Sequence, residues 1–135
     1  MEELFRQLDT LNLPMTDYAI TGSGPLYAHG LIPLLENDID IIARNKAWVK
    51  SLTYGNPKTG ELGDLIINLF NDRIQIFNEW FYSNETVNEI INNAEMHGGY
   101  PFASLNHVLM WKKKSMRPKD ILHIKLIEKY QKKRI

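Results

Sequence analysis

The pattern of apolar and polar positions along the chain predicts a mixed order of short helices and short strands. Helices are expected at residues 2–11, 25–30, 45–54, 84–94, 104–113 and 117–133. Strands are expected at residues 18–21, 39–43, 64–70 and 73–80, with a connection at 33–37, a loop at 54–64 and a turn or short strand at 96–104. This order predicts an α/β (α+β) fold, in which a small mixed β-sheet is flanked by helices.

Capping and turn residues support several of these boundaries. The expected N-caps are Asn45, Thr86 and Ser104. Glu89 follows Thr86 at the spacing of a capping box. Asn71 and Asp72 separate two runs rich in β-branched and aromatic residues, which predicts a β-hairpin.

Length and composition favour one globular domain over residues 1–135. The chain has 135 residues, 44% of them hydrophobic and 24% charged, which is ordinary for a soluble protein. No apolar run approaches the roughly 20 residues of a membrane-spanning helix, so no membrane partner is expected. The chain has no cysteine, which excludes disulfides and thiolate metal sites and is compatible with a cytoplasmic protein. Its four histidines lack the mutual spacing of a zinc site, and none is assigned to a metal: His29, His97, His107 and His123.

The net charge of zero conceals an asymmetry along the chain. Residues 112–135 contain ten lysines or arginines but only two acids, Asp120 and Glu128, so the helical segment 104–135 ends in a basic region. Such a region indicates an anionic partner, such as nucleic acid or nucleotide phosphates, or pairing with the acidic remainder of the chain. Asp120 is also expected to pair with Lys112 or Arg117.

Asp38 and Asp40 interrupt an otherwise aliphatic stretch. On a strand, residues two positions apart point to the same face, so the two carboxylates would lie side by side. Paired carboxylate oxygens suit Mg²⁺, which takes one or two protein carboxylates and completes its shell with water and phosphate. The alternative is an exposed strand end or a helix cap.

A turn of small residues precedes this pair. Gly22, Ser23 and Gly24 lack bulk, so their backbone N–H groups can approach a phosphate closely at the start of the following helix. An ordinary strand-to-helix turn would require the same glycines. The combination of this turn with the two aspartates predicts one site for phosphate and metal.

The segment Ile20-Thr21-Gly22-Ser23, followed after about fifteen residues by Asp38-Ile39-Asp40-Ile41, resembles the signature of the nucleotidyltransferase superfamily. Lys112 followed by Arg117-Pro118-Lys119-Asp120 is similar to a segment of its minimal and toxin–antitoxin-type members. The resemblance covers residues 18–43 and 107–127.

The resemblance implies transfer of a nucleoside monophosphate from a nucleoside triphosphate (NTP) to a hydroxyl group. It implies that Asp38 and Asp40 bind Mg²⁺ or Mn²⁺, and that Gly22 and Ser23 hold the triphosphate. Lys112 and Lys119 would offset phosphate charge. The acceptor stays open between tRNA, a protein hydroxyl and a small molecule, and its recognition can involve a homodimer or a partner subunit.

A third carboxylate is expected on a neighbouring strand in catalytically active members. The corresponding strand here reads Ile74-Gln75-Ile76, and glutamine cannot act as a general base. Glu79, four residues after Gln75, is the remaining candidate for a catalytic carboxylate. Two alternatives therefore stay open: a nucleotide-binding or regulatory module that has lost the reaction, and an RNA-binding or partner-binding protein that acts through its basic last helix.

Overall fold

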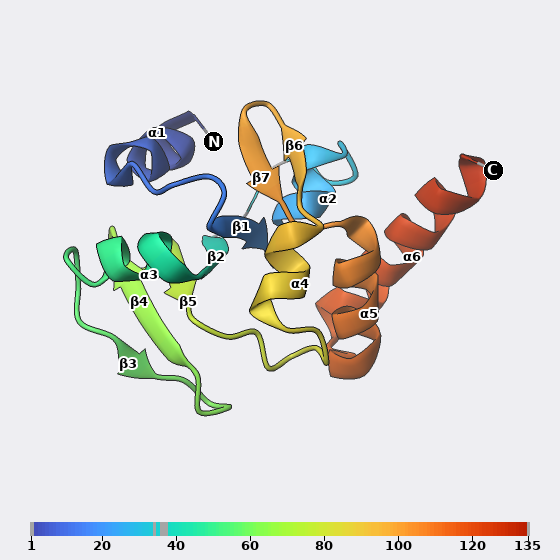
Figure 1. Ribbon diagram of the computed structural model, residues 1–135. Coiled ribbons are helices and arrows are strands. Elements are labelled where there is room, and N and C mark those ends of the chain that lie inside the picture. The colour runs from blue at the N-terminus through green and yellow to red at the C-terminus, as the bar shows by residue number, and fades with distance from the viewer. Residues whose placement is uncertain (1, 34, 36–37, 135) are drawn as a thin grey trace.

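The computed structural model describes residues 2–33, 35 and 38–134, and its elements follow the predicted mixed order (Figure 1). The helices are α1 (Glu2–Leu11), α2 (Gly24–Ala28), α3 (Asn45–Ser51), α4 (Val87–Asn92), α5 (Leu105–Ser115) and α6 (Pro118–Lys133). The strands are β1 (Tyr18–Thr21), β2 (Ile39–Ala43), β3 (Lys58–Thr59), β4 (Leu65–Leu69), β5 (Ile74–Phe77), β6 (Glu95–His97) and β7 (Tyr100–Phe102). The predicted fold class, a mixed sheet flanked by helices, is confirmed. The expected connection at 33–37 lies partly outside the described residues.

The strands of the described residues form one mixed sheet in the order β3-β4-β5-β2-β1-β7-β6. At its centre β2 is antiparallel to β1 and parallel to β5. The predicted hairpin is confirmed, because β4 and β5 pair antiparallel. The register places Asp40 of β2 opposite Thr21 of β1 and opposite Gln75 of β5. Three polar residues therefore form a row across three adjacent strands.

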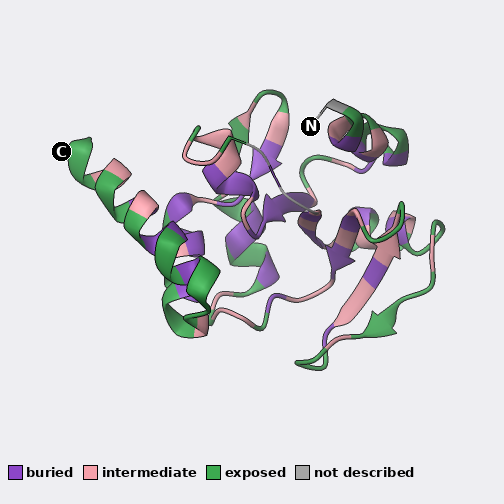
Figure 2. Ribbon diagram, turned by 180° about the vertical axis from the view of Figure 1, so that it is seen from behind, coloured by how far each residue is buried: buried purple, intermediate pink, exposed green. Residues whose placement is uncertain are grey.

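One face of the sheet packs against α1. Ile20, Ile41 and Ile76, from the three central strands, are fully buried on this face, together with Leu4 and Leu8 of the helix. Because strand side chains alternate between faces, the residues beside these isoleucines point the other way. The interior of the sheet is buried in Figure 2.

The opposite face packs against α4, α5 and α6. Ala19, Ile42 and Phe77 contribute to this second core, with Val108 of α5 and Ile127 of α6. By the same alternation, Thr21, Asp40 and Gln75 point to this face, two residues along their strands from its apolar positions. The apolar layer therefore ends in polar side chains.

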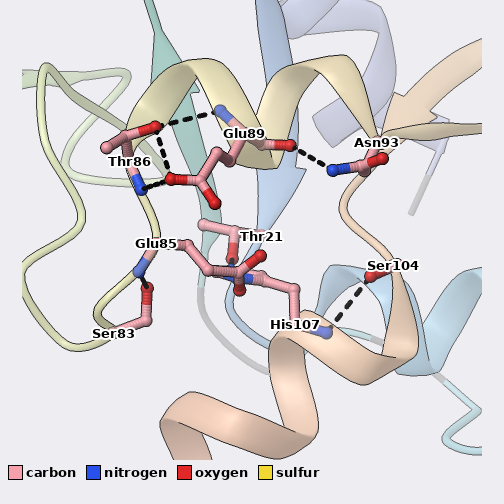
Figure 3. Close-up of polar contacts among 8 residues, drawn as sticks. All are labelled: Thr21, Ser83, Glu85, Thr86, Glu89, Asn93, Ser104 and His107. Atoms are coloured by element: carbon pink, nitrogen blue, oxygen red, sulfur yellow. Dashed lines mark hydrogen bonds and ion pairs between the residues drawn. The ribbon is translucent and has the colours of Figure 1, made fainter.

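Local capping explains where α4 and α5 begin. Thr86 Oγ1 accepts from the backbone N–H of Glu89 at 3.2 Å, and the Glu89 carboxylate accepts from the backbone N–H of Thr86 at 3.3 Å (Figure 3). This reciprocal pair confirms the predicted capping box. The Ser104 hydroxyl accepts from the backbone N–H of His107 at 3.1 Å, as expected of an N-cap.

Two local predictions around α3 are wrong. Asn45 is not the N-cap, because its φ of 48° differs from the extended backbone of a capping residue, and Arg44 holds that position. The helix ends at Ser51 rather than near residue 54. Within the segment 54–64, expected to be a loop, β3 pairs with β4.

The last helix extends beyond the sheet, and its final turn is largely exposed (Figure 2). Over the residues that the structure describes, no helix has both the length and the apolar character needed to cross a membrane.

Candidate functional site

A pocket of about 250 Å³ opens where the second face of the sheet becomes polar. Its polar lining residues are Gly22, Ser23, Asp38, Asp40, Gln75, Lys112, Arg117 and Lys119. Its other lining residues are Leu35, Phe77, Trp80, Tyr82 and Trp111. The structure therefore gathers the small-residue turn, the aspartate pair and the basic segment around one cavity. Its volume is just below the roughly 300–1,000 Å³ of small-molecule sites.

The pKa values of Asp38 and Asp40 are both raised in this pocket. Burial, followed by the negative charge of Asp38, raises the pKa of Asp40 to about 7. Burial also raises the pKa of Asp38, and the positive charge of Lys119 offsets part of that increase. The negative charge of Asp38 thus opposes the ionisation of Asp40, and a cation bound between the two carboxylates would stabilise both charges. The pair therefore fits a divalent cation.

Gln75 lies between this pair and Asn68. The amide orientation that satisfies its surroundings directs the Gln75 nitrogen toward the carboxylates, 2.8 Å from Asp38 Oδ2 and 3.2 Å from Asp40 Oδ1. An amide nitrogen carries two N–H donors, so it can donate to both aspartates. Gln75 thus compensates part of their negative charge, at the register position where the sequence analysis expects a third carboxylate.

The turn before α2 packs directly on Asp40. Gly22 has a φ of 62°, and a Cβ built on it would collide with Asp40 Oδ2. Only glycine combines this backbone with so close an approach. Ser23 occupies the N-cap of α2, and its side chain makes no capping hydrogen bond. Ser23 therefore lines the pocket without a capping role for its hydroxyl.

A buried chain of hydrogen bonds holds β1 just before this turn (Figure 3). His107 Nε2 lies 3.0 Å from Thr21 Oγ1, and His107 Nδ1 lies 2.8 Å from Glu85 Oε1. Burial lowers the pKa of His107 although Glu85 acts in the opposite direction, so the ring is neutral at neutral pH. Because Thr21 is fully buried, this chain fixes the position of Gly22 rather than presenting a nucleophile.

The basic segment forms a buried ion-pair cluster that joins α5 to α6. Lys112 Nζ donates to Asp120 Oδ1 at 2.9 Å, and Arg117 Nε donates to Asp120 Oδ2 at 3.0 Å. Burial alone would raise the pKa of Asp120, but these hydrogen bonds from Arg117 and Lys112 lower it below its ordinary value. The expected pairing of Asp120 with Lys112 and Arg117 is confirmed. This cluster orients the helices that form one wall of the pocket.

The three cations of the pocket wall differ in what already binds them. Lys112 is 1% exposed and paired with Asp120, so its positive charge is already partly balanced by that carboxylate. The side chain of Arg117 is 60% exposed despite its bond to Asp120. Lys119 is exposed and, within the described part of the chain, makes no direct ion pair. Lys119 and Arg117 are therefore the residues most available to an anionic ligand.

Glu79 is not brought to this pocket. Glu79 lines a separate hollow with Arg44, Asn78 and Asn88. The register explains this, because β5 pairs Gln75 with Asp40 and then runs away from Asp38, so Glu79 lies beyond the opposite end of the strand. In the described residues, Asp38 and Asp40 are the carboxylates that line the pocket.

The aromatic wall is a feature that the sequence analysis missed. Trp80 packs on Tyr82 and on Trp111, with ring centroids 4.9 Å and 5.4 Å apart. The indole N–H groups of Trp80 and Trp111 are buried and have no hydrogen-bond partner in the described chain. Nothing in the local sequence around either tryptophan indicates that it lines a polar cavity.

In comparisons with known proteins, no family model, no curated protein and no solved structure matches this chain.

Proposed function

We propose that this protein binds an NTP together with Mg²⁺ or Mn²⁺ and transfers the nucleoside monophosphate to a hydroxyl acceptor. The observation that carries this proposal is the pocket in which Asp38 and Asp40 face the Gly22-Ser23 turn and the cations of α5 and α6. A pocket that combines carboxylates with lysine and arginine suits a metal-bound polyphosphate, which presents positive and negative charge together.

The donor set fits a hard divalent cation. Asp38 and Asp40 would hold it, since their oxygens are the ligands that Mg²⁺ prefers, and a cation would stabilise the ionised forms that burial disfavours. When bound, Mg²⁺ would neutralise developing charge on the phosphoryl group and on the pyrophosphate that leaves.

The turn, the exposed cations and the aspartates have different roles in this proposal. The Gly22-Ser23 turn would hold the triphosphate against Asp40, while Lys119 and Arg117 would bind phosphate oxygens. The acceptor oxygen forms a bond to the α-phosphorus while the bond to pyrophosphate breaks. The acceptor proton passes to Asp38, Asp40 or water, because Gln75 cannot accept it. A cytoplasmic location, where NTPs are available, belongs to the same proposal.

Gln75 favours a second candidate function, nucleotide binding without transfer. Its amide donates to both aspartates at the position expected for a third carboxylate. A chain with this substitution can retain the nucleotide site as a regulatory module.

Two measurements on the purified protein test these candidates together. Isothermal titration with a non-hydrolysable NTP should give Mg²⁺-dependent binding that the double substitution Asp38→Asn/Asp40→Asn abolishes. Glu128→Gln, on the exposed surface of α6, is the matched control and should bind normally. Unchanged affinity in the double variant would refute both candidates.

Pyrophosphate release then separates transfer from binding. Release with tRNA, protein or small hydroxyl acceptors, lost in the double variant, supports transfer. Mg²⁺-dependent binding without release for any of these acceptors supports the regulatory module.

A further inference from the structure

We propose that His29, Glu95 and His97 form a second cation site, separate from the aspartate pair, which binds a divalent transition metal ion such as Zn²⁺. Each of these residues offers one ligand atom, and the three atoms lie within 4.8 Å of one another. Two imidazoles and one carboxylate are a ligand set that zinc sites commonly use.

The fold brings the three residues together from distant parts of the sequence. Glu95 and His97 are two positions apart on β6, so strand alternation directs both to one face. Met96 between them is 58% exposed. His29 is the C-cap residue of α2, and Figure 1 shows this helix beside the β6–β7 hairpin. A metal here would link the helix that follows the Gly22-Ser23 turn to the edge of the sheet.

One ring nitrogen of His97 is available to bind a metal. Its Nε2 atom is buried and has no hydrogen-bond partner in the described chain. A buried nitrogen without a partner costs free energy, and binding a metal would offset that cost. The rings of His97 and His29 pack in a T-shaped arrangement with centroids 4.6 Å apart, so the two imidazoles are already adjacent.

His29 has a partner of the kind that orients metal-binding histidines. Its Nδ1 lies 3.3 Å from the Tyr130 hydroxyl of α6, which leaves Nε2 for a metal. Arg134 also donates to the Tyr130 hydroxyl, at 2.9 Å, and is the cation that faces the cluster.

The chemistry of this cluster differs from that of the aspartate pair. Imidazole nitrogens favour Zn²⁺ and its transition-metal neighbours, whereas a pair of carboxylates favours Mg²⁺. Zinc–ligand bonds of about 2.0–2.1 Å require ligand atoms roughly 3.4 Å apart, so the side chains must close slightly around the ion. Glu95 is exposed, so its carboxylate can be approached from solvent. Three protein ligands leave the fourth position to water.

Thermal unfolding of the full chain with zinc chloride tests the proposal. The melting temperature of the wild type should rise with Zn²⁺, and His29→Asn or His97→Gln should weaken zinc affinity at least 30-fold. Tyr130→Phe, which removes only the orienting hydroxyl, should weaken it about 10-fold. The absence of a zinc response in the wild type would overturn the proposal.

Asp38→Asn/Asp40→Asn is the control that separates the two sites. This double variant should keep the full zinc response while losing the response to Mg²⁺. A zinc response that survives in both histidine variants, or that disappears only in the aspartate variant, would overturn the proposal. Cobalt substitution gives a second measurement, because Co²⁺ bound by His29 and His97 should show visible absorption bands that either histidine variant lacks.

Discussion

Asp40 and Asp120 are two carboxylates close to one pocket, and the fold treats them in opposite ways. Asp120 accepts hydrogen bonds from Lys112 and Arg117, and its pKa is held below the ordinary range. Asp40 lies beside another carboxylate and an amide, and burial, followed by the charge of Asp38, raises its pKa to about 7. The ionised form of Asp120 is therefore stabilised within the chain, whereas the ionised form of Asp40 is disfavoured until a bound cation stabilises it.

The largest effect is expected from removal of the Asp120 carboxylate. Asp120→Asn should lower the free energy of unfolding by about 3–5 kcal/mol, because it leaves the buried Lys112 ammonium without its partner. Chemical denaturation measures this loss. The matched control is Glu128→Gln on the same helix, whose 3.5 Å pair with Lys113 is exposed and should contribute less than about 1 kcal/mol. Adding Lys112→Met to Asp120→Asn should recover part of the stability, and a further loss would contradict this interpretation.

Burial of His123 close to Lys112 should make the fold sensitive to acid. Burial, and then the charges of Lys112 and Lys119, lower the pKa of His123 to about 4 from 6.5. The unfolded chain therefore binds more protons between these values, so stability falls as the pH decreases from about 6.5 to about 4. Relative to His123→Gln, the wild type should lose up to about 3 kcal/mol over this window, measured by urea denaturation. Parallel profiles for the two proteins would exclude this contribution.

Removal of the Asp40 carboxylate should have the opposite effect on stability to removal of the Asp120 carboxylate. Without metal, Asp40→Asn should raise the free energy of unfolding by about 1–2 kcal/mol at neutral pH, because it removes a carboxylate whose ionisation is opposed by burial and then by Asp38. Mg²⁺ should stabilise the wild type but not this variant, as thermal unfolding with and without the ion will report. A loss of stability in the metal-free variant would place Asp40 with Asp120 as a structural carboxylate.

Replacing the Gln75 amide with a carboxylate tests whether the aspartate pair is a cation site, because it adds a third negative charge. Gln75→Glu should lower metal-free stability by about 1 kcal/mol and raise Mg²⁺ affinity, since a third carboxylate increases both repulsion and ligation. Gln75→Leu removes the same hydrogen bonds without adding charge and should not raise Mg²⁺ affinity. Equal Mg²⁺ affinity in the two variants would argue against a cation site beside Gln75.

The smallest effect on the fold is expected at the unpaired cation of the pocket wall. Lys119→Met should change stability by less than about 0.5 kcal/mol, because the side chain is exposed. It should nevertheless weaken binding of a non-hydrolysable NTP several-fold, measured by isothermal titration. Lys125→Met, exposed on the same helix and outside the pocket lining, should leave that affinity unchanged.

The sequence predicts most of the fold because its signals are local. Strand alternation, the Thr86–Glu89 capping box and the Ser104 cap each depend on neighbouring residues, and the structure confirms them. The prediction of Asn45 as an N-cap is wrong because its backbone adopts a left-handed conformation, which the residue type alone does not reveal.

The candidate site is only partly predictable, because part of it depends on contacts between residues that are distant in the sequence. Asp38 and Asp40 share a face through local alternation, whereas their proximity to Lys119 depends on how α6 packs. His29 and His97 are far apart in the sequence, so spacing along the chain did not bring them into one prediction. The two-residue separation of Glu95 and His97 on β6 was the available local signal.

Crystals soaked with Mn²⁺ and a non-hydrolysable NTP would test whether the aspartate pair is a cation site for a nucleotide. We predict an anomalous peak within bonding distance of Asp38 and Asp40, with the triphosphate on the Gly22-Ser23 turn and near Lys119. A bound nucleotide without manganese at these carboxylates, or no nucleotide in the pocket at all, would contradict the proposed function.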